Sequence, residues 1–222
     1  MTKFIAAAFL LTTPLFAAPQ TKPDRLDNVL NQMDAASAKF KYAQADLTQD
    51  TYERVVKDTT TDKGSIYFIG KGPSTEMGLK LDPPTTRLVA YKNGVVRVFD
   101  PAANAITEVR SAQVATYLAI AFGGGGTDLK KTWDITDKGA EQIDGVAVEH
   151  LDLISKDPEV RKSVAHVEIW VDPTRAISLK QQIFLPGGDY KTSHYTHIRY
   201  NEKVDTAPYA IKTNKETKID RR

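Results

Sequence analysis

The residues that could carry chemistry in this chain are few, and they form no recognised catalytic motif. Of the four histidines, His194 and His197 make a His-x-x-His pair on an expected strand, apart from His150 and His166. Side chains three residues apart on a strand point to opposite faces, so this pair cannot hold one metal ion without a bulge. We therefore expect solvent-facing histidines and no metal site.

A run of four glycines is the next feature that could bind a ligand: Gly123, Gly124, Gly125 and Gly126. It lacks the Gly-Lys-Ser/Thr ending of a phosphate-binding loop, and the segment before it has the pattern of a helix. A helix stop or a flexible hinge is the better interpretation. The chain also has no Gly-x-Ser-x-Gly elbow and no His-Glu-x-x-His motif. We expect no catalytic residue and no cofactor, although a triad dispersed along the sequence is compatible with the pattern.

Composition excludes some kinds of partner and some kinds of cysteine chemistry. The net charge is only +2 over 222 residues, which argues against a nucleic-acid partner held by bulk electrostatics. The chain has no cysteine, so it has no disulfide, no thiolate nucleophile and no acylated N-terminal cysteine of its own. Its stability must come from a hydrophobic core.

The first 18 residues have the pattern of a secretory signal peptide. Lys3 precedes an apolar run that reaches Phe16, and Ala17-Ala18 offers a cleavage point. The run is too short to span a bilayer, which needs roughly 20 apolar residues. The sequence therefore predicts export, most simply to a bacterial periplasm.

Two helices and about eleven strands are expected in the remaining chain. Apolar residues recur at helical spacing over residues 23–42 and again over 112–122, and a short helical turn is possible at 127–131. Strand patterns separated by Gly, Pro, Asn and Asp turn signals occupy residues 45–52, 64–71, 76–82, 87–92, 95–100, 105–109, 132–140, 146–155, 165–172, 177–185 and 192–204. The strand connections are short, so we expect one antiparallel, strongly curved sheet with the helices covering one face. Alternation in 76–82 and 165–172 predicts one apolar and one wet face. Trp133 and Trp170 fit either a ligand pocket or ordinary packing.

The clearest local signal is the hairpin of residues 86–101, where Asn93-Gly94 suits a type I′ turn and Asp100-Pro101 ends the second strand. Together with Gly64–Pro73, the 45–50 strand and the segments 171–190 and 195–198, this hairpin resembles the periplasmic outer-membrane lipoprotein carrier (LolA-like) family. The resemblance covers roughly residues 26–204. It implies an α+β single domain, an incomplete antiparallel β-barrel with a helical lid over an apolar cavity. One departure is that Gly72 stands where the typical carrier has an arginine that closes the lid.

The resemblance implies a cavity that holds acyl chains. From alternation, its expected lining comprises Leu30, Met33, Phe68, Met77, Leu79, Leu81, Leu88, Phe99, Leu118 and Phe122. Lys71 or Arg87 could replace the missing lid arginine, and the glycine run would serve as the lid hinge.

The same resemblance implies the organisation and the partners. Residues 19–208 would form the binding domain, and residues 209–222 a mobile basic tail. The implied function is to shuttle acylated lipoproteins from an inner-membrane lipoprotein-releasing ABC transporter to an outer-membrane receptor, without catalysis. Two alternatives remain: a binder or sensor of other lipids, and a lipid hydrolase with a polar cluster inside the cavity.

Overall fold

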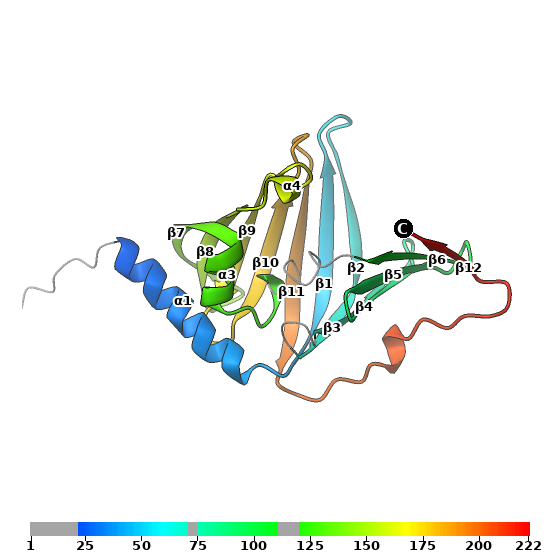
Figure 1. Ribbon diagram of the computed structural model, residues 1–222, viewed down its shortest axis with the longest axis horizontal. Helices are drawn as coiled ribbons and strands as arrows, with labels where there is room; N and C mark the ends of the chain where they lie inside the picture. The colour runs from blue at the N-terminus through cyan, green and yellow to red at the C-terminus, as the bar shows by residue number, and fades with distance from the viewer. Residues whose placement is uncertain (1–21, 71–74, 111–119) are drawn as a thin grey trace, which may run out of the picture.

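The computed structural model describes residues 22–70, 75–110 and 120–222, and these residues build one bent sheet with helices against one face (Figure 1). The sheet has 12 strands within the described residues, in the order β12-β6-β5-β4-β3-β2-β1-β11-β10-β9-β8-β7. The first and last strands of this order do not pair, so the barrel is incomplete, as the sequence predicts.

Most elements follow the expected segments closely. The helices are α1 (Lys22–Lys39), α3 (Gly126–Thr132), α4 (Pro158–Arg161) and the 3-10 turn η2 (Ala207–Tyr209). The strands are β1 (Tyr42–Glu53), β2 (Asp58–Ile69), β3 (Glu76–Leu81), β4 (Arg87–Lys92), β5 (Val95–Asp100), β6 (Ala105–Arg110), β7 (Trp133–Ile143), β8 (Val146–Ser155), β9 (His166–Asp172), β10 (Ile177–Phe184), β11 (Tyr190–Tyr200) and β12 (Lys218–Arg221). The expected helix over 112–122 lies mostly outside the described residues.

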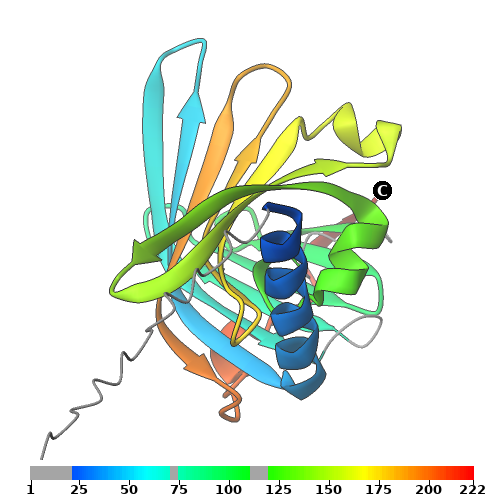
Figure 2. The same ribbon diagram turned by 90° about the vertical axis from the view of Figure 1, so that its left-hand side faces the viewer.

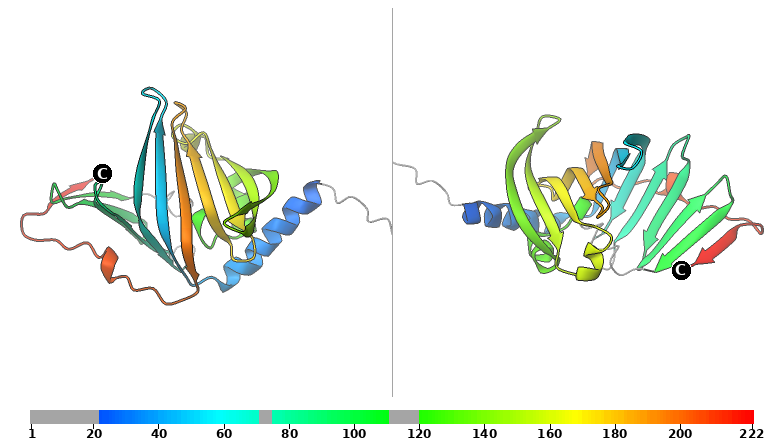
Figure 3. Two further views of the ribbon diagram at one scale, coloured as in Figure 1. Left: turned by 180° about the vertical axis from the view of Figure 1, so that it is seen from behind. Right: turned by 90° about the horizontal axis from the view of Figure 1, so that it is seen from above.

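Two expectations about the sheet are corrected. The link expected between the strands at 45–52 and 64–71 is shorter than predicted: residues 58–63 belong to β2 and pair with β1, so the reversal falls between Glu53 and Asp58. The sheet is also not wholly antiparallel. Within the segment expected to be a mobile tail, Lys218–Arg221 forms β12, which pairs in parallel with β6 (Figure 3).

Strand register assigns each side chain to one of two faces. Directly paired residues share a face, so Leu47, Phe68 and Met77 lie on one face, while Thr48 and Tyr67 lie on the other. We call the first the inner face, because the helices pack on it, and the second the outer face. Figure 2 shows α1 within the curve of the sheet, beneath β7 and β8.

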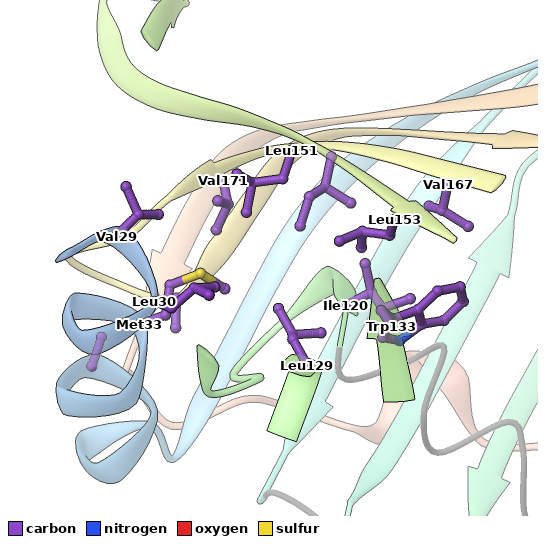
Figure 4. Packing of buried hydrophobic residues seen from close by; sticks show 13 residues of the cluster. Val29, Leu30, Met33, Ile120, Leu129, Trp133, Leu151, Leu153, Val167 and Val171 are labelled. Carbon is purple, nitrogen blue, oxygen red and sulfur yellow. The ribbon is translucent and has the colours of Figure 1, made fainter. Parts of the chain in front are cut away.

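Helix α1 packs its apolar stripe on the inner face at the β7–β9 end of the sheet. Val29, Leu30 and Met33 join one buried cluster with Leu151 and Val171 of the strands (Figure 4). Leu129 of α3 and Trp133 complete this cluster. No helix among the described residues combines the length and the apolar character needed to cross a bilayer.

A second buried cluster continues along the inner face over β1 to β4. It contains Phe40, Phe68, Met77, Tyr91 and Phe122, among others. The two clusters together make most of the inner face apolar from β8 to β4, and the buried Gln181 and Ser193 are polar exceptions on it.

Candidate functional site

The inner face remains apolar beyond the strands that α1 covers. Register places Leu79 of β3 opposite Val89 of β4, Val89 opposite Val98 of β5, and Tyr91 opposite Val96. Leu79, Val89, Val96 and Val98 are only partly buried, whereas Tyr91 is fully buried. This patch of four partly buried side chains, which we call the β3–β5 patch, is apolar surface that the described helices do not fully cover.

Most of the expected lining residues share this inner face. Leu30 and Met33 lie in the first cluster; Phe68, Met77, Leu81 and Phe122 lie in the second, and Leu79 packs against it. Leu118 lies outside the described residues. Apart from the partly buried Leu79, these residues are buried within their clusters, so in this state they form a packed core.

Leu88 and Phe99 are corrected. Leu88 pairs with both Lys80 of β3 and Phe99 of β5. Paired residues share a face, so Leu88 and Phe99 lie on the outer face with Lys80, opposite Leu79. They cannot line a surface formed by Met77 and Leu79.

Phe122 occupies the middle of the inner face. Its ring stacks on Phe68 at 4.4 Å between centroids and meets Tyr195 edge to face at 5.0 Å. Burial raises the pKa of Tyr195 to about 12, so its hydroxyl is neutral at physiological pH. Ser178 Oγ donates to the backbone oxygen of Ile120 at 2.8 Å, which anchors this segment to β10. Phe122 therefore fills apolar space that would otherwise be open.

The glycine run packs closely against α1. A Cβ on Gly126 would lie 2.3 Å from the backbone oxygen of Leu30, and one on Gly123, whose φ is +75°, would lie 2.6 Å from Phe40 Cδ1. A Cβ on Gly125 would lie 2.6 Å from Asp34 Oδ1. The structure thus gives these glycines a reason besides hinge flexibility: Gly126 approaches the Leu30 backbone, while Gly123 and Gly125 approach the side chains of Phe40 and Asp34.

Polar groups fasten α1 to the rest of the molecule. Ser37 Oγ donates to the Gly123 backbone oxygen at 2.6 Å, and Asp34 accepts from the Thr127 backbone N–H at 3.0 Å and its hydroxyl at 2.6 Å. At the other end of α1, the Arg25 guanidinium pairs with Asp137 of β7 at 3.3 Å and with Glu149 of β8.

The Arg25 contact is the latch-like feature that sequence reasoning missed. Burial raises the pKa of Glu149 and nearby Asp137 raises it further, while Arg25 opposes both effects. Arg25 therefore offsets charge that is costly to bury beside the helix. An arginine near the start of an amphipathic helix is the only sequence signal for this contact, and it does not reveal the partner strand.

The expected latch residues are placed differently. The Arg87 guanidinium lies 3.5 Å from Asp100 on the neighbouring strand, which is a partly exposed ion pair within the sheet. Lys71 and Gly72 lie outside the described residues.

The two histidines of the His-x-x-His pair are not brought together. His194 Nε2 lies 3.0 Å from Asp144 Oδ2, whereas His197 Nδ1 lies 2.9 Å from Asp46 Oδ2. His197 has a φ of +48° at a bulge in the β1–β11 pairing. The bulge exists, yet each histidine has its own carboxylate partner.

A pocket of about 370 Å³ lies beside the bulges of β10 and β11. Its apolar walls include Val146, Leu179 and Ile198, which belong to a small cluster with Trp170, and Asp144 and Arg175 stand among its polar lining residues. Trp170 itself packs between His150 and Lys180 on the outer face. This pocket is the rival to the β3–β5 patch as a ligand site.

Comparison with known proteins finds similarity of fold. No family model matches the chain, and no curated protein matches it by sequence. An uncharacterised conserved protein from Thermus thermophilus superposes with a TM-score of 0.56 at 10% identity, over 89% of this chain and 99% of that one. MucB in the MucA/MucB complex of Pseudomonas aeruginosa gives 0.51 at 13% identity, over 85% of this chain and 61% of that one.

Structures similar to this chain also include a LolA superfamily protein from Nitrosomonas europaea, with a TM-score of 0.41 at 13% identity, over 82% of this chain and 96% of that one. The open 12-stranded sheet gives the chain the incomplete-barrel fold expected from its resemblance to the lipoprotein carriers.

Proposed function

We propose that this protein binds the acyl chains of a lipid or lipoprotein on the inner face of its sheet and carries them without covalent chemistry. The observation that supports this most is the continuity of the inner face. It is mostly apolar from β8 to β5, and the four neighbouring side chains of the β3–β5 patch are only partly buried. A core that served stability alone would have no need to extend past the helices that bury it.

The packed state would be the unloaded form. Each methylene group of an acyl chain gains about 0.8 kcal/mol when it leaves water. In the unloaded form α1 and Phe122 cover the inner face, so cargo must displace side chains that already pack there. This competition lowers the net affinity and keeps binding reversible, which a carrier requires.

The polar contacts of α1 are compatible with a helix that moves away from the inner face and returns to it. Arg25, Asp34 and Ser37 hold α1 by ion pairs and hydrogen bonds that water can replace when the helix moves away. Such contacts fix where the helix returns, while the apolar contacts supply most of the closing energy. Gly123 to Gly126 could then act as the hinge of this cover.

The compartment and partners follow from the export signal and the carrier resemblance. We place the protein in a periplasm, delivered by a signal peptide of residues 1–18. Cargo would come from an inner-membrane ABC transporter that releases lipoproteins and pass to an outer-membrane receptor. A second candidate role is a lipid-responsive binding module, because MucB, which shares the fold, occurs in a complex with MucA.

The test uses neighbouring residues on one strand. Val89 and Leu88 are both partly buried on β4, yet they face opposite sides of the sheet. We expect Val89→Gln to weaken binding of a fluorescent fatty acid by about tenfold, and Leu88→Gln to leave it unchanged. Leu179→Gln tests the rival pocket.

Three outcomes would overturn the proposal: equal loss in Val89→Gln and Leu88→Gln, loss in Leu179→Gln alone, or no saturable binding by the unmodified protein. Circular dichroism of each variant checks that the sheet is intact. Native mass spectrometry of protein purified from a bacterial periplasm then identifies the cargo, and separates an attached lipoprotein from a free lipid.

A further inference from the structure

A polar cluster on the outer face of β8 and β9 has the composition of a metal site. Asp152 of β8 and Glu168 of β9 are directly paired across the strands, and His166 lies two residues from Glu168 on the same face. One ligand atom from each of the three lies within 4.8 Å of the others. The cluster lies on the face opposite the α1 contacts and is independent of the proposed lipid site.

The cluster places the carboxylates of Asp152 and Glu168 directly opposite each other on neighbouring antiparallel strands. Like charges directly opposite each other in an antiparallel pair are destabilising. The Asp152 and Glu168 side chains are each 18% exposed, so water screens them only in part. His166 Nδ1 lies 2.7 Å from Asp152 Oδ1. The ring of His166 is held flat against Phe184 at 4.1 Å between centroids, which fixes its direction.

His150 supplies a second, independent observation. Its Nδ1 lies 2.9 Å from Glu141 Oε1, and its ring stacks on Trp170 at 4.1 Å. Its Nε2 is buried and has no hydrogen-bond partner within the described part of the chain, although it lies 3.4 Å from Glu168 Oε2. If the Nδ1–H of His150 donates to Glu141, Nε2 carries a lone pair. This lone pair faces the Glu168 carboxylate, which can only accept a hydrogen bond.

Two acceptors facing each other need a cation between or beside them. A metal ion held by Asp152, His166 and Glu168 supplies this cation next to Glu168, and it also offsets the Asp152–Glu168 repulsion.

We propose that Asp152, His166 and Glu168 bind one divalent transition-metal ion of the zinc class, with water completing its coordination. Imidazole and carboxylate ligands together suit zinc, which takes four ligands at structural sites. The ion ties β8 to β9 directly behind the strand segments on which α1 packs. Its role is to stabilise this end of the open sheet.

The test compares Glu168→Gln with His197→Ala. Glutamine keeps the shape of Glu168, removes the like charge and can donate to His150 Nε2, so the variant folds without metal. His197 also contacts a carboxylate but lies outside the cluster. Calorimetric titration with zinc chloride after chelator treatment should give one equivalent per chain for the unmodified protein and for His197→Ala. For Glu168→Gln the affinity should fall by at least about tenfold.

Thermal unfolding shows whether the bound ion stabilises the fold. Zinc should raise the melting temperature of the unmodified protein but not that of Glu168→Gln, because a ligand stabilises only the state that binds it. In metal-free buffer, Glu168→Gln should unfold at the same or a higher temperature, since the repulsion is gone. Absence of stoichiometric zinc binding, or equal zinc binding by Glu168→Gln, would overturn the proposal.

Discussion

Replacing Phe122 by alanine should destabilise the fold and at the same time strengthen acyl binding. Phe122 is 4% exposed, and its ring packs between Phe68 and Tyr195 on the inner face. Phe→Ala substitutions in packed cores cost about 3–5 kcal/mol. A packed core with no carrier role predicts the first effect but not the second.

The gain in binding can be worked from the space that the ring leaves. About four methylene groups of an acyl chain could take its place, and at about 0.8 kcal/mol each they would gain about 3 kcal/mol. That corresponds to an increase in affinity of about a hundredfold. Part of the lost stability should return when the ligand binds, because the chain refills the cavity.

The assay is titration with a fluorescent fatty acid, paired with thermal unfolding in its presence and absence. Phe99→Ala is the matched control, because Phe99 lies on the outer face. It should lower stability without changing acyl affinity. If Phe122→Ala binds the probe no more tightly than the unmodified protein, the inner face is a filled core and the reasoning fails.

Two further predictions concern stability. Asp172 is buried, which raises its pKa, but hydrogen bonds from the 173–175 turn outweigh burial and hold the pKa below its usual 3.8. The charged form therefore stabilises the fold above pH ~3.8, so Asp172→Asn should cost about 2 kcal/mol at neutral pH in denaturant titrations. That cost should shrink as the pH falls through the lowered pKa; a constant cost would contradict the assignment. Gly126→Ala should lower stability by about 1–3 kcal/mol, because its Cβ meets the Leu30 backbone. Gly187→Ala, where a Cβ meets nothing within 4 Å, is its control, and equal melting temperatures would refute the close-packing argument.

Alternation within one strand predicted which of its residues share a face. It could not predict which residues of the neighbouring strand lie on that same face of the sheet. Met77, Leu79 and Leu81 alternate with polar residues, so their common face is readable from the sequence alone. Leu88 and Phe99 are apolar too, and only the pairing of Leu88 with Lys80 shows that they face the other way. Register between strands joined by a longer loop is a tertiary property, since the loop does not fix which residues pair.

Contacts that form only when α1 packs on the sheet could not be predicted from the sequence either. Arg25 meets Asp137 and Glu149 only because α1 crosses β7 and β8, which are more than 100 residues away in the chain. The glycine run illustrates the same limit. Its composition suggested flexibility, and the approach of Leu30 to Gly126 becomes visible only when both backbones are placed.

The account's central claim is that the inner face of the sheet holds an acyl chain, and photo-crosslinking tests it most directly. A fatty acid with a photoreactive group in its chain is bound to the protein and activated, and the labelled residues are mapped by mass spectrometry. We predict labels at Leu79, Val89, Val96 and Val98, removed by excess unlabelled fatty acid. Labels confined to Leu179 and Ile198 in the rival pocket, or scattered without competition, would contradict the claim.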